Sequence, residues 1–162
     1  MPGENSLLPQ YYNDDFQVVV FNNAIAAPHD PTILLYADRD MIIDEIVVGV
    51  HAVGGTAAVL SFEATVDIGS ATPAGTPMAT VNIDTANITA GDTFVLTTDG
   101  ITRTTSAGVV TTSSTGTTAI NGVTAGVQSN LIPKGSWLVA DITGTIGAGR
   151  VAVQVRFRSR LK

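Results

Sequence analysis

The stretch that decides the fold is IIDEIVVGVHAVGGTAAVLSFEATVDI, residues 42–68. In its second half the even positions from 58 to 68 are all apolar, whereas the odd positions include Ser61, Glu63 and Asp67. Alternation with a period of two is typical of a strand with one buried and one solvated face. We therefore predict two long strands, 42–53 and 57–68, joined at Gly54-Gly55 as an antiparallel hairpin.

The same signals recur along the chain. Alternating valines from Val151 to Phe157 indicate a further strand near the C-terminus, with Arg150, Gln154 and Arg156 on its other face. Shorter candidates, each bounded by Gly, Pro or Asn-Gly turns, lie at 16–21, 32–36, 78–83, 93–97, 109–112, 117–123 and 136–144. About eight to ten strands at this spacing predict an all-β, jelly-roll-like antiparallel β-sandwich, and no convincing helix is visible.

The composition agrees with this fold class. The chain has 162 residues, including 22 Thr but only two Lys and three Glu, and β-branched residues favour strands. The absence of cysteine excludes disulfide scaffolds and thiolate metal sites. With 44% hydrophobic and 14% charged residues but no run that spans a bilayer, the chain has more apolar surface than one domain hides. We expect no membrane partner, and we expect self-association to bury the surplus.

Three parts are expected along the chain. Residues 1–15 form an N-terminal arm in which Leu7, Leu8, Tyr11 and Tyr12 are either a frayed end or docked on a neighbouring subunit. Residues 16–162 form a single sandwich domain. Within it, 97–130 is predicted as a Thr/Gly-rich hairpin excursion, because valine and isoleucine recur among its small polar residues.

Charge is unevenly divided. Ten of the fourteen acidic residues lie between Glu4 and Asp67, whereas five of the eight bases lie in the last thirteen residues. These bases are all even-numbered and share one face of an extended strand: Arg150, Arg156, Arg158, Arg160 and Lys162. Such a face suits either nucleic acid or a solvated or subunit contact with acidic neighbours. The net charge of −6 opposes nucleic acid as a partner, so the second interpretation is favoured.

The chain carries no recognisable catalytic motif, and we do not expect an enzyme, a cofactor or a metal. Two histidines, His29 and His51, lack a third ligand of suitable spacing. The densest carboxylate cluster, Asp38, Asp40, Asp44 and Glu45, lacks the glycine of a calcium loop and is interpreted as a charged turn before a strand. Trp137 is the only tryptophan; it suits sugar stacking, although packing is its commoner role.

Two phrases support a family resemblance: Leu131–Val139 (LIPKGSWLV) and Thr89–Thr93 (TAGDT). With the expected hairpin over 40–67, the chain resembles small jelly-roll virion proteins of tailed bacteriophages, in which a turn of the form I/L-x-x-G-D/S often introduces a strand. The resemblance implies a capsid decoration (cement) protein, a homotrimer on the outer surface of the virion bound to the major capsid protein. The alternative is a receptor- or carbohydrate-binding head of a phage tail fibre. Expected contact residues are Leu7, Leu8, Tyr11, Tyr12, Arg150, Arg156, Arg158 and Arg160.

Overall fold

A computed structural model describes residues 14–22, 32–53, 55–68, 77–84, 86, 88–112, 116–120, 123–124, 127–128, 130–143 and 150–159. Of the predicted arm, 1–15, the residues up to 13, with the leucines and tyrosines, lie outside the described residues, whereas Asp14 and Asp15 belong to the first strand. His29, Arg160 and Lys162 also lie outside the described residues. No helix long and apolar enough to cross a membrane occurs in the part of the chain that is described.

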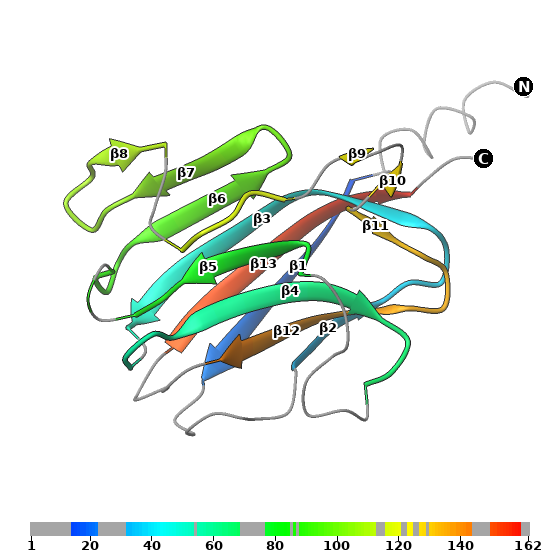
Figure 1. Cartoon of the computed structure of the whole chain (residues 1–162), viewed down its shortest axis with the longest axis horizontal. Helices are drawn as coiled ribbons and strands as arrows, with labels where there is room; N and C mark the ends of the chain where they lie inside the picture. The colour runs from blue at the N-terminus through cyan, green and yellow to red at the C-terminus, as the bar shows by residue number, and fades with distance from the viewer. Residues whose placement is uncertain are drawn as a thin grey trace, which may run out of the picture.

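The strands form two main sheets whose pairings are all antiparallel (Figure 1). The large sheet has the order β1 (Asp14–Asn22), β13 (Arg150–Ser159), β3 (Met41–Ala52), β6 (Thr93–Thr97), β7 (Gly100–Thr104) and β8 (Val110–Thr111), and β11 (Leu131–Ile132) also pairs with β3. The small sheet has the order β2 (Thr32–Tyr36), β12 (Trp137–Thr143), β4 (Val59–Thr65) and β5 (Ala79–Asn82). A separate ribbon pairs β9 (Val123–Thr124) with β10 (Val127–Gln128).

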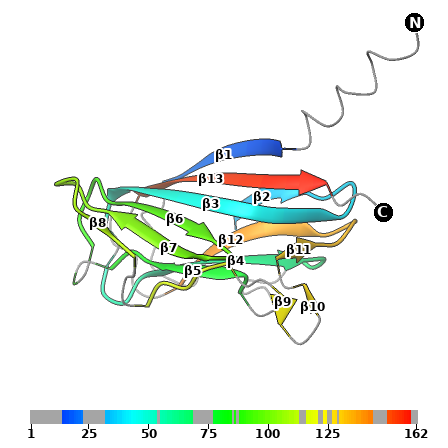
Figure 2. The ribbon, with the colours of Figure 1, turned by 90° about the horizontal axis from the view of Figure 1, so that it is seen from above.

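Eight of these strands, β1 to β6 with β12 and β13, follow jelly-roll topology. The large sheet places the first, eighth, third and sixth of them side by side, and the small sheet places the second, seventh, fourth and fifth side by side. Figure 2 shows the two sheets as stacked layers. The prediction of an all-β, jelly-roll-like antiparallel sandwich is therefore confirmed, and the other strands, β7 to β11, lie between β6 and β12 in sequence.

The predicted hairpin over 42–68 is wrong. Both strands form, but β3 belongs to the large sheet and β4 to the small one, so the chain crosses between the layers after β3. In this link Ala57 has a φ of 56°. Each strand is interior to its own sheet, where β3 lies between β13 and β6 and β4 lies between β12 and β5. Within each strand alternation therefore identifies the buried face but not the partner. Beyond the end of β4 at Thr65 the expectation is wrong, because Val66 and Ile68, predicted on the buried face, are 78% and 40% exposed.

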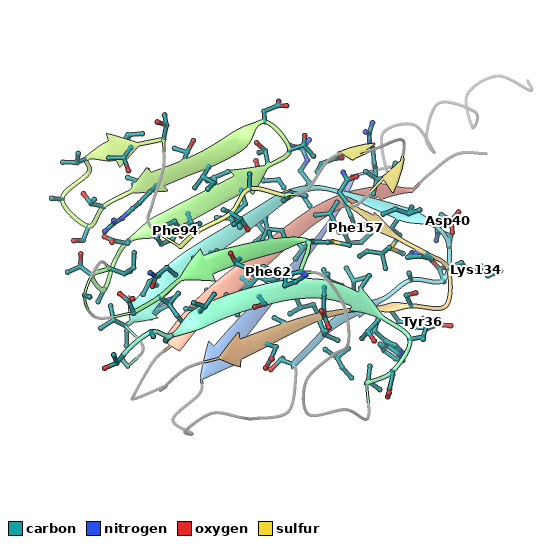
Figure 3. All side chains as sticks on the ribbon, viewed as in Figure 1. Tyr36, Asp40, Phe62, Phe94, Lys134 and Phe157 are labelled. Atoms are coloured by element: carbon teal, nitrogen blue, oxygen red, sulfur yellow. The ribbon has the colours of Figure 1, made fainter. Side chains whose placement is uncertain are left out.

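The core lies between the two sheets. On β13 the side chains of Val151, Val153, Val155 and Phe157 are buried, as the alternation predicts. They join a single apolar cluster to which β3, β4 and β6 also contribute. Figure 3 labels three of its aromatic members, Phe62, Phe94 and Phe157.

The predicted strand 117–123 is wrong over its first residues. Thr118 makes only an isolated bridge to Thr80, and the next paired residues are those of β9. Threonine hydroxyls explain why no continuous strand forms here, because they accept hydrogen bonds that the backbone carbonyls of a paired strand would otherwise accept. The Thr117 Oγ1 accepts from the N–H of Asn82 at 3.1 Å, and the Thr118 Oγ1 accepts from the N–H of Thr80 at 3.0 Å. The segment thus runs along the side of β5 that is not paired with β4 and makes only a few contacts with it.

Two turns of similar sequence lead into β6 and β12: Ile88–Asp92 (ITAGD) and Ile132–Ser136 (IPKGS). In each turn the glycine has a positive φ, 94° in the first and 88° in the second. Its N–H donates to a distant carbonyl, that of Val50 at 2.7 Å or that of Ala37 at 2.8 Å. The residue after the glycine donates its N–H to the carbonyl three residues earlier, at 3.1 Å and 3.0 Å respectively. The same local phrase therefore anchors the start of one strand in each sheet.

Candidate binding face on the small sheet

The outer face of the small sheet carries an aromatic pair at one end. Trp137 on β12 lies opposite Tyr36 on β2 and opposite Thr65 on β4. The two rings have their centroids 4.6 Å apart and are tilted by 52°. Tyr36 is 50% exposed, and Figure 3 shows it at the margin of the molecule. The pairing of β2 with β12 thus brings Tyr36 against Trp137, the residue that the sequence analysis considered for sugar stacking.

Further apolar side chains are exposed on the same strands or just beyond them. Ile33 on β2 is 43% exposed, and Val66 and Ile68, which follow β4, are 78% and 40% exposed. We call Ile33, Tyr36, Val66, Ile68 and Trp137 the aromatic rim. A gathering of large apolar side chains at a surface is typical of an interaction site.

A charged turn borders the aromatic rim. Asp38 and Arg39 follow β2 and form an exposed ion pair at 2.9 Å, and the hydrogen bond from Arg39 lowers the pKa of Asp38 below its ordinary value. The Asp40 carboxylate accepts from the backbone N–H of Lys134 at 3.0 Å, and Figure 3 shows both residues near Tyr36. The predicted charged turn before β3 is thus what the structure shows, with these carboxylates facing separate partners.

Two carboxylates are buried further along the outer face. Glu63 lies opposite Val139, and Asp141 lies opposite Ser61, so the two acids are diagonal neighbours. Glu63 is only 5% exposed and Asp141 6%, and Val139 is fully buried. The expectation that Glu63 faces solvent is therefore wrong: it points away from the core as the alternation requires, but this row of the outer face is covered.

Burial makes the Glu63 carboxylate costly to ionise. Its Oε1 has no hydrogen-bond partner among the described residues. Burial, followed by the negative charge of Asp141, raises the pKa of Glu63 above its ordinary value near 4.5. The folded protein consequently holds this proton at a pH where the unfolded chain has released it.

Replacing Glu63 with glutamine should flatten the dependence of stability on pH. The proton on Glu63 favours the folded state fully below about pH 4.5, and this contribution is lost as the pH rises through the raised pKa. We expect E63Q to be more stable than wild type at pH 8 and to lose less free energy of unfolding between pH 5 and pH 8. Urea denaturation across that range measures it. Asp67→Asn, at an exposed acid on the same segment, is the control, and equal slopes in E63Q and wild type would contradict the assignment.

The described bases of β13 lie beside acids of β3. Arg158 Nε is 3.3 Å from Asp44 Oδ1, and Arg156 lies directly opposite Glu45. Arg150 begins the strand, with only its backbone described. Some of the acidic residues from the first part of the chain and some of the bases of the last strand are therefore neighbours within the large sheet. Sequence reasoning separated these charges along the chain and missed that β3 and β13 are neighbours.

A shallow hollow of about 400 Å³ lies where β3 ends and β6 begins. It is lined by Gly49, Val50, His51, Gly91, Asp92 and Thr93. His51 is exposed, as its place on the polar side of the strand predicts. The Asp92 carboxylate at this hollow is already engaged by structural contacts: it accepts from Arg103 Nη2 at 2.6 Å and from the N–H groups of Thr89 and Ser106. The hollow therefore offers few free polar groups.

Comparison with known proteins adds no relative. No model of a protein family matches the chain, and no curated protein matches it.

Proposed function

We propose that the chain is a non-enzymatic structural virion protein, a decoration protein that binds the major capsid protein on the outside of a phage capsid as a homotrimer. The observation that carries the proposal is the aromatic rim, in which four large apolar side chains are exposed next to the half-buried Trp137. Jelly rolls are common in viral capsid proteins, so the fold is compatible with this role by analogy. Exposed apolar side chains in a chain with only 14% charged residues suit a protein that works bound to a large surface.

Binding to shells tests the proposal. Purified chain, which we expect to be a trimer at micromolar concentration by light scattering, is mixed with capsids of the encoding phage that lack it, and the pellet is analysed after sedimentation. The double variant Tyr36→Ser, Val66→Ser should lose at least tenfold in affinity, since about 25 cal/mol is lost per Å² of apolar area. Both residues are largely exposed, so the variant should fold. Asp99→Asn, exposed at the β6–β7 turn, is the control. A monomer that does not sediment with shells would overturn the proposal.

A second candidate function is glycan binding by a fibre head, and the contact between Tyr36 and Trp137 favours it. The exposed Tyr36 ring and the half-buried Trp137 ring, with the polar Thr65 opposite the tryptophan, suit stacking on a sugar ring. Because Trp137 is the only tryptophan, its fluorescence reports on this site alone. Saturable changes with a glycan, abolished in Tyr36→Ala but kept in Asp99→Asn, would establish the activity. A glycan array without hits and an unchanged emission spectrum would reject it.

A further inference from the structure

The side of the large sheet that faces away from the core is built from four neighbouring strands, β13, β3, β6 and β7. Their register brings alternate residues into shared rows, in which 152 pairs with 49, 49 with 93 and 93 with 104. We call this outward side the flat face. Its centre is formed by half-buried side chains and one glycine: Val47, Gly49, Thr93, Val95, Ala152 and Gln154. The residues between them on β13, β3 and β6 are buried in the core, and Figure 2 shows the sheet as an outer layer.

The flat face carries almost no charge. The solvated side of an antiparallel sheet normally presents polar and charged side chains. In the three rows that the four strands share, the outward residues are valine, alanine, glycine, threonine and glutamine, apart from Glu45 and Arg156. These two lie directly opposite each other on β3 and β13. The face is therefore neutral, although the chain has a net charge of −6.

Small residues keep this face open to close approach. Gly49 lies between Ala152 and Thr93 in one row, and nothing lies within 4 Å of a Cβ added to Gly49. Gly49 and Thr93 also line the shallow hollow described above. Residues of this size allow a second sheet to approach to about 10 Å, the distance at which sheets stack. The flat face thus suits sheet-on-sheet packing.

The area of the sheet is sufficient for a specific contact. The strands β1, β13 and β3 have nine, ten and twelve residues, and β6 and β7 have five each. At about 3.3 Å a residue and about 4.8 Å between strands, the sheet has a face of roughly 600 Å². Two such faces together bury roughly 1,200 Å², the lower end for specific, stable interfaces.

The charges favour a second copy of this chain as the occupant. Copies with a net charge of −6 repel one another, and a neutral face lets them approach at the lowest electrostatic cost. Glu45 and Arg156 add one charge of each sign, so equal faces brought together meet without net repulsion. A nucleic acid or a strongly charged protein would find no surplus of charge here to pair with.

We infer that copies of this chain associate through the flat face. The inference deepens the proposed function and rests on it for the number of copies. In the proposed homotrimer the three large sheets face the common axis, and the aromatic rim, on the small sheet, is left outward for the capsid. Of the contact residues expected from the sequence, Arg156 lies on the flat face.

A charged side chain in the middle of the flat face tests the inference. Gly49→Lys places an ammonium group where space is open, so the variant should keep the β-sheet spectrum and a cooperative urea transition. Between associated copies that charge is buried without a partner, which is strongly unfavourable. We expect the dissociation constant for self-association, measured by sedimentation equilibrium, to rise at least a hundredfold. Thr56→Lys, at an exposed site between β3 and β4, is the matched control and should associate as wild type does.

Thiol labelling supplies a second measurement, since the chain has no native cysteine. The rate at which maleimide reacts with Gly49→Cys should rise at least tenfold on dilution to the monomer, whereas Thr56→Cys should react at one rate throughout. Slow labelling of Gly49→Cys that persists on dilution would show that the chain covers this face itself, which overturns the inference. A monomeric wild type, or unchanged association of Gly49→Lys, would overturn it as well.

The shell-binding assay keeps this inference separate from the proposed function. An oligomer that Gly49→Lys dissociates but that does not bind shells supports the inference and rejects the function. Shell binding by an oligomer that Gly49→Lys leaves intact does the reverse. If Gly49→Lys stays oligomeric but no longer binds shells, the flat face belongs to the contact with the capsid, and the inference is wrong.

Discussion

Replacing Asp92 with alanine should lower the free energy of unfolding by about 3–5 kcal/mol, the cost of breaking a buried ion pair from one side. Asp92 is fully buried, and its carboxylate accepts from Arg103 at 2.6 Å, from the N–H of Thr89 at 3.1 Å and from the N–H of Ser106 at 2.9 Å. Alanine removes these three contacts and the longer ones from the Thr89 hydroxyl, at 3.3 Å and 3.4 Å. The loss is large against the 5–15 kcal/mol that typically stabilises a domain.

The conservative replacement separates charge from shape. Asp92→Asn keeps one acceptor oxygen and the side-chain volume but loses the charge that pairs with Arg103, so we expect a smaller loss than in D92A. Arg103 also lies over the Phe94 ring, with its guanidinium carbon 5.8 Å from the ring centroid. Arg103→Met keeps most of that packing, and a double-mutant cycle between R103M and D92A isolates the ion pair. A loss below 1 kcal/mol in D92A, measured by urea denaturation, would contradict this account of the turn.

The Asp92 carboxylate also makes the stability of the folded state depend on pH. Burial raises the pKa of Asp92, but the hydrogen bonds from Thr89, Arg103 and Ser106 outweigh it and hold the pKa below its ordinary value near 3.8. A depressed pKa stabilises the folded state above about pH 3.8, and the contribution is lost as the pH falls through the lower, folded value. Wild type should therefore approach the stability of D92A in strong acid.

The sequence predicts local structure better than partners. The TAGDT phrase identifies a turn before a strand, but nothing local indicates that Asp92 binds Arg103, because that contact depends on the β6–β7 hairpin folding back over the turn. For the same reason alternation identifies the buried faces of β3 and β4 and yet suggests the wrong pairing. Long-range strand order is set by the packing of both layers, which no short window of sequence contains.

On the outer face of the small sheet, too, the sequence predicts local structure but not the contacts between distant segments. Tyr36 and Trp137 are recognisable as aromatic residues on strands, but their contact follows from the β2–β12 pairing of segments far apart in sequence. Glu63 points outward, as the period of two predicts. It is nevertheless only 5% exposed, because that row of the outer face is covered. Periodicity assigns a direction to a side chain, whereas exposure depends on the rest of the molecule.

Of the two glycines in the similar turns, Gly91 should tolerate alanine less well: we expect G91A to lower the free energy of unfolding by about 3 kcal/mol. Its φ of 94° is unfavourable for any residue with a Cβ, which costs roughly 1–2 kcal/mol. A Cβ at this position would also lie 2.9 Å from the Cβ of Ser106. Ser106 cannot easily move away, because its N–H is bound to Asp92.

The matching turn supplies the control. Gly135 has a nearly equal φ of 88°, but nothing lies within 4 Å of its added Cβ, so Gly135→Ala should cost only the backbone strain, about 1–2 kcal/mol. Gly49, on β3 in extended conformation and also with open space, should tolerate alanine with no loss. The expected order of destabilisation in urea is G91A, then G135A, then G49A. Equal losses at Gly91 and Gly135 would show that backbone strain alone fixes both glycines and that Ser106 yields, which would also weaken the case that Asp92 holds that residue in place.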